Sequence, residues 1–224
     1  MSRVHHAVLA VGSLLLSAAS ALAGPTYTFT TSEGVQPSNV GTITLTQVNS
    51  TTVDLLVDLA DTALPLPRYG FINTGGPHTP FAFTLAGTES GVSATFIQPA
   101  GGIYAFGIFS LSTVNGGATP YGTYGISINS TAGNGTSNAY FGDLELNVTR
   151  TSGLSTDDFI SNASIDPGSS GPAFFAADLT DGGSNTGSQA WKTRTTFKVP
   201  EPGMLALLSL AFAGLGLARR RKLN

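Results

Sequence analysis

The sequence predicts an all-β body, an antiparallel β-sandwich or jelly roll of about ten strands, between an N-terminal signal peptide and a C-terminal transmembrane helix. Short runs from Tyr27 to Val199 alternate apolar and polar side chains, which is the period of a strand with one buried face. Glycine-rich turns separate these runs, and an apolar stretch stands at each end of the chain. We therefore divide the chain into residues 1–23, 24–198 and 199–224.

The first 23 residues have the organisation of a secretory signal peptide. Arg3 precedes an apolar stretch at residues 7–19, which is too short for a permanent membrane helix. Ala21 and Ala23 are small residues at the two positions that a signal peptidase reads. We therefore expect signal peptidase to cleave before Gly24 and the rest of the chain to be exported.

The body contains a series of expected strands that share the alternating pattern. In the clearest one, Val53, Leu55 and Val57 alternate with polar neighbours, which predicts one buried and one solvated face. The expected strands cover Thr42 to Val48, Thr51 to Leu59, Phe81 to Leu85, Ile103 to Leu111, Tyr121 to Ile128, Asp143 to Val148 and Trp191 to Val199. One short helix is expected after Ser155, with Asp157 and Asp158 at the positive end of its dipole.

The last 26 residues form a tripartite tail. Four residues, Val199, Pro200, Glu201 and Pro202, are followed by an apolar run from Gly203 to Ala218 and then by Arg219, Arg220, Arg221 and Lys222. The apolar run would form about 24 Å of helix against roughly 30 Å of bilayer hydrocarbon, which makes a short membrane anchor. The four cations should remain in the cytoplasm by the positive-inside rule. The two prolines keep the segment before the helix extended.

This tail resembles the PEP-CTERM sorting signal of Gram-negative bacteria, and the resemblance covers the tail alone. It implies export, a transient inner-membrane intermediate with a cytoplasmic C-terminus, and processing by exosortase, a membrane protease-transpeptidase. It assigns Val199 to Pro202 to recognition and Arg219 to Lys222 to retention in the membrane. The implied partners are signal peptidase, exosortase and the inner membrane, and the implied destination is the cell surface or extracellular matrix. A plain C-terminal membrane anchor is the alternative.

Composition excludes several function classes for the body. Residues 24–198 contain twelve acidic and five basic residues, a net charge of −7, which argues against nucleic acid as a partner. The chain has no cysteine, so it has no disulfide, thiolate metal site or cysteine nucleophile. Serine and threonine are abundant, so hydroxyl groups solvate the surface in place of ions.

The residues of the body offer little for catalysis. His78 is the only histidine left after removal of the leader, and we interpret it as a surface-loop residue. Asp143 and Glu145 lie on one face of an expected strand, whereas a glycosidase needs two carboxyl groups facing each other across a cleft. We therefore predict that the body is not an enzyme and needs no cofactor.

One turn offers oxygen ligands to a hard cation such as calcium. Asp178, Asp181 and Asn185 lie close together in the sequence, but their spacing matches no known calcium loop. A polar hairpin turn is the favoured interpretation, and calcium is the alternative.

Three of the body's five cations, Lys192, Arg194 and Lys198, alternate along the final expected strand. The favoured interpretation is an edge strand protected by charge. Contact with anionic headgroups or with an acidic polysaccharide is the alternative.

The leading hypothesis for function is a non-enzymatic surface or extracellular-matrix protein, processed by exosortase and linked to exopolysaccharide or biofilm. The alternative is a carbohydrate-binding module in which Tyr69, Tyr121, Tyr124 or Trp191 presents its ring to a sugar. Burial of these rings would exclude that alternative. A third hypothesis, a glycan-acting hydrolase, requires a facing carboxylate pair in a cleft.

Overall fold

The computed structural model describes residues 25–34, 36, 40–60, 69–76, 78–97, 109–161 and 163–197. The expected signal peptide at 1–23, with its cleavage point at Ala21, Ala23 and Gly24, lies outside these residues, as does the tail at 199–224. Within the described ranges, no helix is long and apolar enough to cross a membrane.

The described residues form antiparallel strands and two short 3-10 helices, which confirms the predicted all-β, antiparallel class. The strands are β1 (Thr26–Gly34), β2 (Gly41–Asn49), β3 (Thr52–Leu59), β4 (Gly70–Phe71), β5 (Phe81–Phe83), β6 (Val92–Ile97), β7 (Phe109–Ser112), β8 (Gly116–Gly117), β9 (Thr123–Tyr124), β10 (Ile126–Ser130), β11 (Leu144–Arg150), β12 (Phe175–Thr180) and β13 (Thr186–Phe197). The helices are η1 (Thr136–Asn138) and η2 (Thr156–Phe159).

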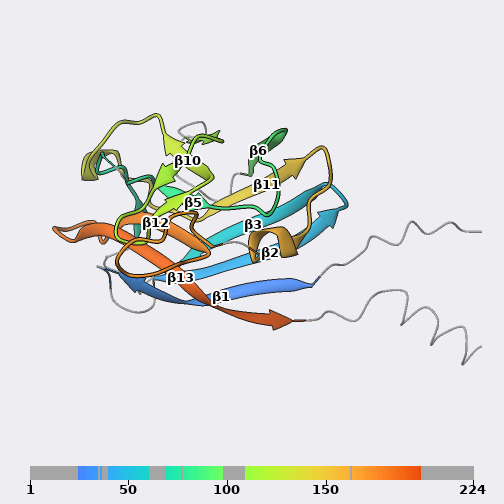
Figure 1. Ribbon diagram of the computed structural model, residues 1–224. Helices are drawn as coiled ribbons and strands as arrows, with labels where there is room; N and C mark the ends of the chain where they lie inside the picture. Colours follow the sequence, from blue (N-terminus) through green and yellow to red (C-terminus); the bar gives the residue numbers. More distant parts are fainter. Residues whose placement is uncertain are drawn as a thin grey trace, which may run out of the picture.

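Hydrogen bonds join most of the strands into one continuous sheet, whose order is β6-β11-β3-β2-β1-β13-β12-β5-β10-β7, with β4 beside β12. The sheet bends over so that its two halves form opposed layers (Figure 1). The end strands of this path approach each other, because the rings of Phe96 in β6 and Phe109 in β7 stack with their centroids 6.1 Å apart. A single rolled sheet thus encloses the core.

The alternating pattern of the sequence places the core side chains. Val53, Leu55 and Val57 point inward from β3 and are fully buried, as the sequence predicts. Aromatic rings fill the middle of the core, where Phe29 meets Phe175 edge-on at 4.8 Å and Phe83 stacks on Phe159 at 5.3 Å. Each such side chain contributes about 1.5–3 kcal/mol on burial, and because the chain has no disulfide, this packing holds the fold together.

A second layer covers the outer face of β12. Every residue of β12 is buried, although only alternate side chains face the main core. The cover consists of the residues around His78 and the separate β8-β9 ribbon, which are joined by a bridge between His78 and Ala118. A small cluster that includes Tyr124 and Ala176 packs beneath this layer. Polar residues on the outer face of β12 are therefore enclosed.

Several strands differ from their expected bounds. The expected strand from Tyr121 to Ile128 is broken into β9 and β10 at Gly125, where the Glu89 carboxylate packs so closely that a Cβ atom would lie 1.4 Å from it. The expected strand from Ile103 is described only from Phe109 onward. The final strand begins at Thr186, five residues earlier than expected, because a tight turn joins it directly to β12.

The strand expected to be a sheet edge, Trp191 to Val199, is the second half of a longer strand whose first half is interior. β13 lies between β12 and β1, and the ladder with β12 runs from Thr186 to Trp191. Lys192 lies just beyond the ladder with β12, and its Nζ lies 2.8 Å from the Glu33 carboxylate and 5.3 Å from the centre of the Tyr121 ring. Beyond Trp191, β13 pairs with β1 alone among the described residues.

The short helix expected after Ser155 is present as η2. The Asp158 carboxylate accepts a 2.7 Å hydrogen bond from the Ser155 backbone N–H and lies 3.0 Å from the guanidinium of Arg150. Arg150 is itself nearly buried and also donates to the backbone carbonyl of Ala86. This network ties three loops together at one end of the sheet.

Candidate functional site

The four aromatic residues proposed as sugar contacts are buried, so that prediction is wrong. Tyr69 and Tyr121 are 6% and 2% exposed, and Tyr124 and Trp191 are fully enclosed. The Tyr121 hydroxyl donates to the backbone carbonyl of Glu33, and the Trp191 indole N–H donates to that of Gly41. These rings fill the core and the space beneath the second layer, so their faces are not available to a sugar.

The candidate calcium loop does not bring its three residues together. The Asp181 carboxylate accepts 2.8 Å hydrogen bonds from the Gly183 backbone N–H and from the Asn185 side chain, within the β12-β13 turn. The Asp178 side chain faces Thr74, away from this turn. Among the described residues, no group of three or more histidine, aspartate and glutamate side chains could hold a metal ion. The loop is the polar hairpin turn of the favoured interpretation.

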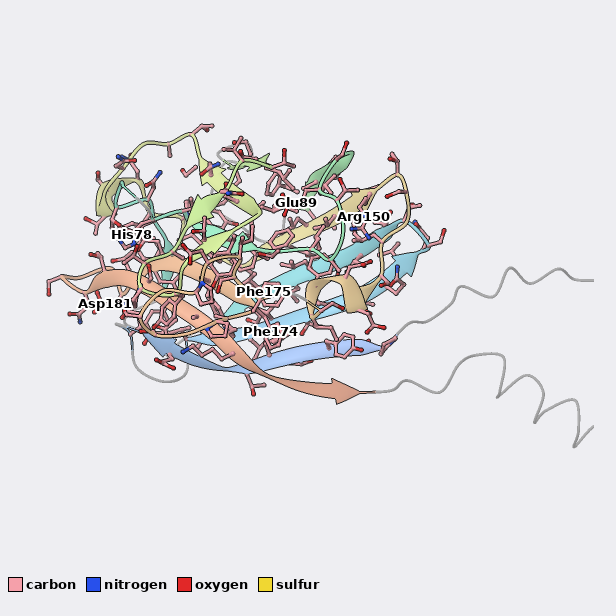
Figure 2. The ribbon with its side chains drawn as sticks, viewed as in Figure 1. His78, Glu89, Arg150, Phe174, Phe175 and Asp181 are labelled. Atoms are coloured by element: carbon pink, nitrogen blue, oxygen red, sulfur yellow. The ribbon has the colours of Figure 1, made fainter. Side chains whose placement is uncertain are left out.

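The fold assembles a polar cluster that the sequence did not predict. It consists of Thr74, His78, Asp178 and Ser188. Asp178 and Ser188 are buried beneath the second layer, whereas His78 is half-buried and Thr74 is exposed. Asp178 and Ser188 are direct cross-strand partners in β12 and β13. His78 Nδ1 lies 3.0 Å from Ser188 Oγ. His78 and the β12-β13 turn at Asp181 lie at the end of the sheet opposite to the start of β1 and the end of β13 (Figure 2).

Asp178 is the most constrained group of this cluster, being only 1% exposed. Its Oδ2 atom accepts hydrogen bonds of 2.9 Å and 2.6 Å from the backbone N–H and hydroxyl of Thr74, while its Oδ1 atom has no hydrogen-bond partner. Burial raises the pKa of this carboxyl above its ordinary value, and the Thr74 hydrogen bonds and the nearby His78 offset only part of this effect.

The geometry of the cluster differs from that of a serine hydrolase. In such enzymes the nucleophilic serine bonds to Nε2 of the histidine, and a carboxylate holds Nδ1. Here the serine hydroxyl occupies Nδ1, and Ser188 is only 2% exposed. The cluster therefore links the loop around His78 to β12 and β13, and it does not present an activated nucleophile.

The carboxylates of β3 and β11 lie side by side on one sheet face. Asp143 lies immediately before β11, and its carboxylate accepts a 3.1 Å hydrogen bond from the Leu59 backbone N–H at the end of β3. Glu145 is a diagonal neighbour of Asp54, since their cross-strand partners are Leu56 and Asn147. Burial and, next, the charge of Glu145 raise the pKa of Asp54. A glycosidase needs two groups that face each other across a cleft, and these carboxylates project from one surface.

Together these features define an all-β domain without disulfides, whose enclosed polar groups connect parts of the fold. The chain carries a PEP-CTERM protein-sorting motif, since residues 198–222 match the model of that family. The match confirms the resemblance drawn from the tail and includes Val199 to Pro202 and Arg219 to Lys222. No curated protein and no solved structure matches the chain.

The matched segment gives the protein a processing partner and a route. A PEP-CTERM tail implies that exosortase processes the protein, and that the protein passes through export and a membrane-anchored intermediate to the surface. The structure connects the tail directly to the sheet, because β13 ends at Phe197 and the match begins at residue 198.

Proposed function

We propose that this is a non-enzymatic exported protein that exosortase sorts and processes for the cell surface or extracellular matrix, where it associates with exopolysaccharide or biofilm. The observation that carries the proposal is the sorting motif at residues 198–222, which follows β13 without a linker. Signal peptidase would release the N-terminus before Gly24. Exosortase would then act on the tail at the outer surface of the inner membrane.

Two features of the body support a role without catalysis. Ser188 is enclosed and bonds to the wrong nitrogen of His78 for a hydrolase. The carboxylates of Asp54 and Glu145 stand on the same sheet face, where no opposing acid meets them in the ladder.

The outer face of the sheet supports a role in a hydrated polysaccharide matrix. Threonine residues lie side by side on β1 and β2, where Thr28 is the direct cross-strand partner of Thr44. Farther along the sheet, Asp54 is flanked by Thr46 in β2 and Asn147 in β11. Hydroxyl, amide and carboxylate groups of this kind exchange hydrogen bonds with water and with sugar hydroxyls.

Intact-mass measurement of the protein from native cells tests the proposal. Membrane and released fractions would be compared in strains with and without exosortase. We expect a released form that starts at Gly24, ends near Pro200 to Pro202 and is made only when exosortase is present. Sugar increments on the released form would support the link to exopolysaccharide.

One outcome would overturn the proposal. If both strains contain a single membrane-bound form that still ends at Asn224, the tail is a plain anchor and the protein stays in the membrane.

A further inference from the structure

β1 and β13, the first and last strands in the sequence, are neighbours in the sheet, and the start of β1 lies beside the end of β13. β1 and β13 pair antiparallel, and the ladder closes with Thr26 opposite Phe197 (Figure 1). The sorting motif therefore begins beside the first residues of the expected mature chain. Any enzyme that reaches this motif also meets the end of the β1-β13 ladder.

β1 is fixed to the body at this end. Tyr27 is buried and pairs with Leu45 of β2, and its hydroxyl donates a hydrogen bond to Asp157 of η2. The Thr156 hydroxyl donates a 3.1 Å hydrogen bond to the carbonyl of Pro25, immediately before the strand. Three separate sets of contacts thus hold the start of β1 in place, independently of β13.

Among the described residues, the backbone of β13 pairs at this end with β1 alone. The ladder with β12 stops at Trp191, whose carbonyl accepts a 3.1 Å hydrogen bond from the Phe174 N–H. From Thr193 to Phe197, the ladders of the described part of the chain join β13 only to β1. Separation of this segment from β1 would leave the β12-β13 ladder intact, whereas β1 cannot move without breaking contacts to β2 and η2.

Only a short segment separates β13 from the apolar run, so opening of the strand would lengthen the chain available to the enzyme. Five residues, 198–202, separate the folded strand from the apolar run, and fully extended they span at most about 18 Å. In the proposed membrane-anchored intermediate, this short connection would confine the motif between the folded sheet and the membrane. Proteins that bind peptides as extended strands pair with the peptide backbone over several residues. The residues just before the motif are at present paired with β1.

We propose that Thr193–Phe197 detaches from β1 during sorting and enters the processing enzyme as an extended segment, so that this strand end is part of the surface that the enzyme recognises. The inference rests on the proposed exosortase sorting. The one-sided pairing of β13, next to a β1 that is fixed on its other side, carries it.

A cross-strand disulfide tests whether the ladder must open. T28C/T195C links direct ladder partners of β1 and β13. T28C/T44C is the matched control, because it links the same residue of β1 to β2 and leaves β13 free. Direct antiparallel partners have Cα atoms about 4.5–5.5 Å apart, within the range that a disulfide spans. The chain has no other cysteine, so each cross-link is unambiguous in the oxidising space outside the inner membrane.

Full-length variants would be expressed in cells with exosortase, and processing would be followed by intact mass. We expect oxidised T28C/T195C to remain in the membrane with Asn224 intact, with processing reduced about tenfold or more because a covalent bond must break before the strand opens. T28C/T44C should be processed as the unmodified chain is. Reduction of the disulfide in isolated membranes should restore processing of T28C/T195C, which shows that the variant is folded and competent.

Two results would overturn the inference while leaving exosortase sorting intact. Oxidised T28C/T195C could be processed as fast as T28C/T44C, or its block could persist after reduction. An unmodified chain that exosortase leaves intact would overturn the proposed function, and the inference with it.

Discussion

At the scale of single residues, Asp178 and Asp181 show how position in one hairpin decides the behaviour of a carboxyl group. Asp178 lies in the buried strand β12 with one oxygen unpartnered, and burial raises its pKa. Asp181 lies in the exposed turn, where the hydrogen bond from the Gly183 N–H is the main cause that lowers its pKa. The two residues are only three positions apart, but their contributions to the free energy of unfolding should depend on pH in opposite directions.

D178N and D181N should therefore change the pH dependence of unfolding in opposite directions. With its raised pKa, Asp178 keeps a proton in the folded state above its ordinary value of 3.8, so its contribution to stability falls as the pH rises through that window. Asp181 contributes stability above 3.8 that is lost as the pH falls through its lowered folded pKa. D178N should remove the first slope and D181N the second.

The measurement is urea unfolding from pH 3 to pH 8, followed by the fluorescence of Trp191, the only tryptophan and a fully buried one. A D178N variant whose stability falls with pH as steeply as that of the unmodified protein above 3.8 would contradict the assignment.

At the scale of elements, the start of β2 depends on the absence of a side chain. Gly41 has a φ of +134°, which residues with a Cβ rarely adopt, and a Cβ there would lie 2.1 Å from the Asp58 carbonyl of β3. The Gly41 carbonyl also accepts the hydrogen bond from the Trp191 indole. This one residue thus joins β2, β3 and β13.

G41A should lower the free energy of unfolding by about 3 kcal/mol or more, because backbone atoms of β3 cannot move aside and the φ is strained as well. G76A is the matched control, since Gly76 has a φ of +64° but no atom within 4 Å of the added Cβ. Strain alone should cost G76A about 1–2 kcal/mol. Urea midpoints of the two variants measure the difference, and equal losses would show that the close approach to β3 does not matter.

The elements also show how far the sequence predicts the fold. The strand around Val53 and Leu55 is predictable because its alternation directly reports one buried face. β12 lacks that signal, because both of its faces are buried and the polar side chains of Asp178 and Thr180 are enclosed, so its sequence does not show that its outer face is covered. The need for glycine at position 125, where the expected strand is broken, was also unpredictable, because the Glu89 carboxylate that leaves no room for a Cβ comes from another loop.

The polar cluster of Thr74, His78, Asp178 and Ser188 was also unpredictable, because it joins residues that are far apart in the sequence. His78 and Ser188 are 110 residues apart, and only the β12-β13 register and the second layer bring them together. For the aromatic residues, the sequence suggested a sugar site that the fold does not provide. The sequence shows that rings such as Tyr121 are present, but it does not show that the fold covers them. The tail needed no fold, since its three parts are contiguous in sequence, and that is where the family match falls.

At the scale of the whole molecule, the proposed function gives the sheet and the tail separate tasks, and it divides recognition and retention between two parts of the tail. β13 ends at Phe197 and the matched segment begins at residue 198, so the folded body would stay close to the membrane until exosortase cuts the tail. As a helix, the apolar run from Gly203 to Ala218 would be about 24 Å long, shorter than the bilayer core of roughly 30 Å, so we expect its retention in the membrane to depend on the cations that follow it.

Two sets of substitutions should separate these tasks. P200A/E201A/P202A removes the motif and keeps the anchor, so the protein should remain in the membrane with Asn224 intact even when exosortase is present.

R219Q/R220Q/R221Q/K222Q keeps the motif and removes the cytoplasmic charges, so in a strain without exosortase the uncut protein should leave the membrane fraction. Fractionation with intact mass distinguishes the two. Normal processing of the first variant would show that Pro-Glu-Pro is not what the enzyme reads, and membrane retention of the second would show that the short helix is a sufficient anchor.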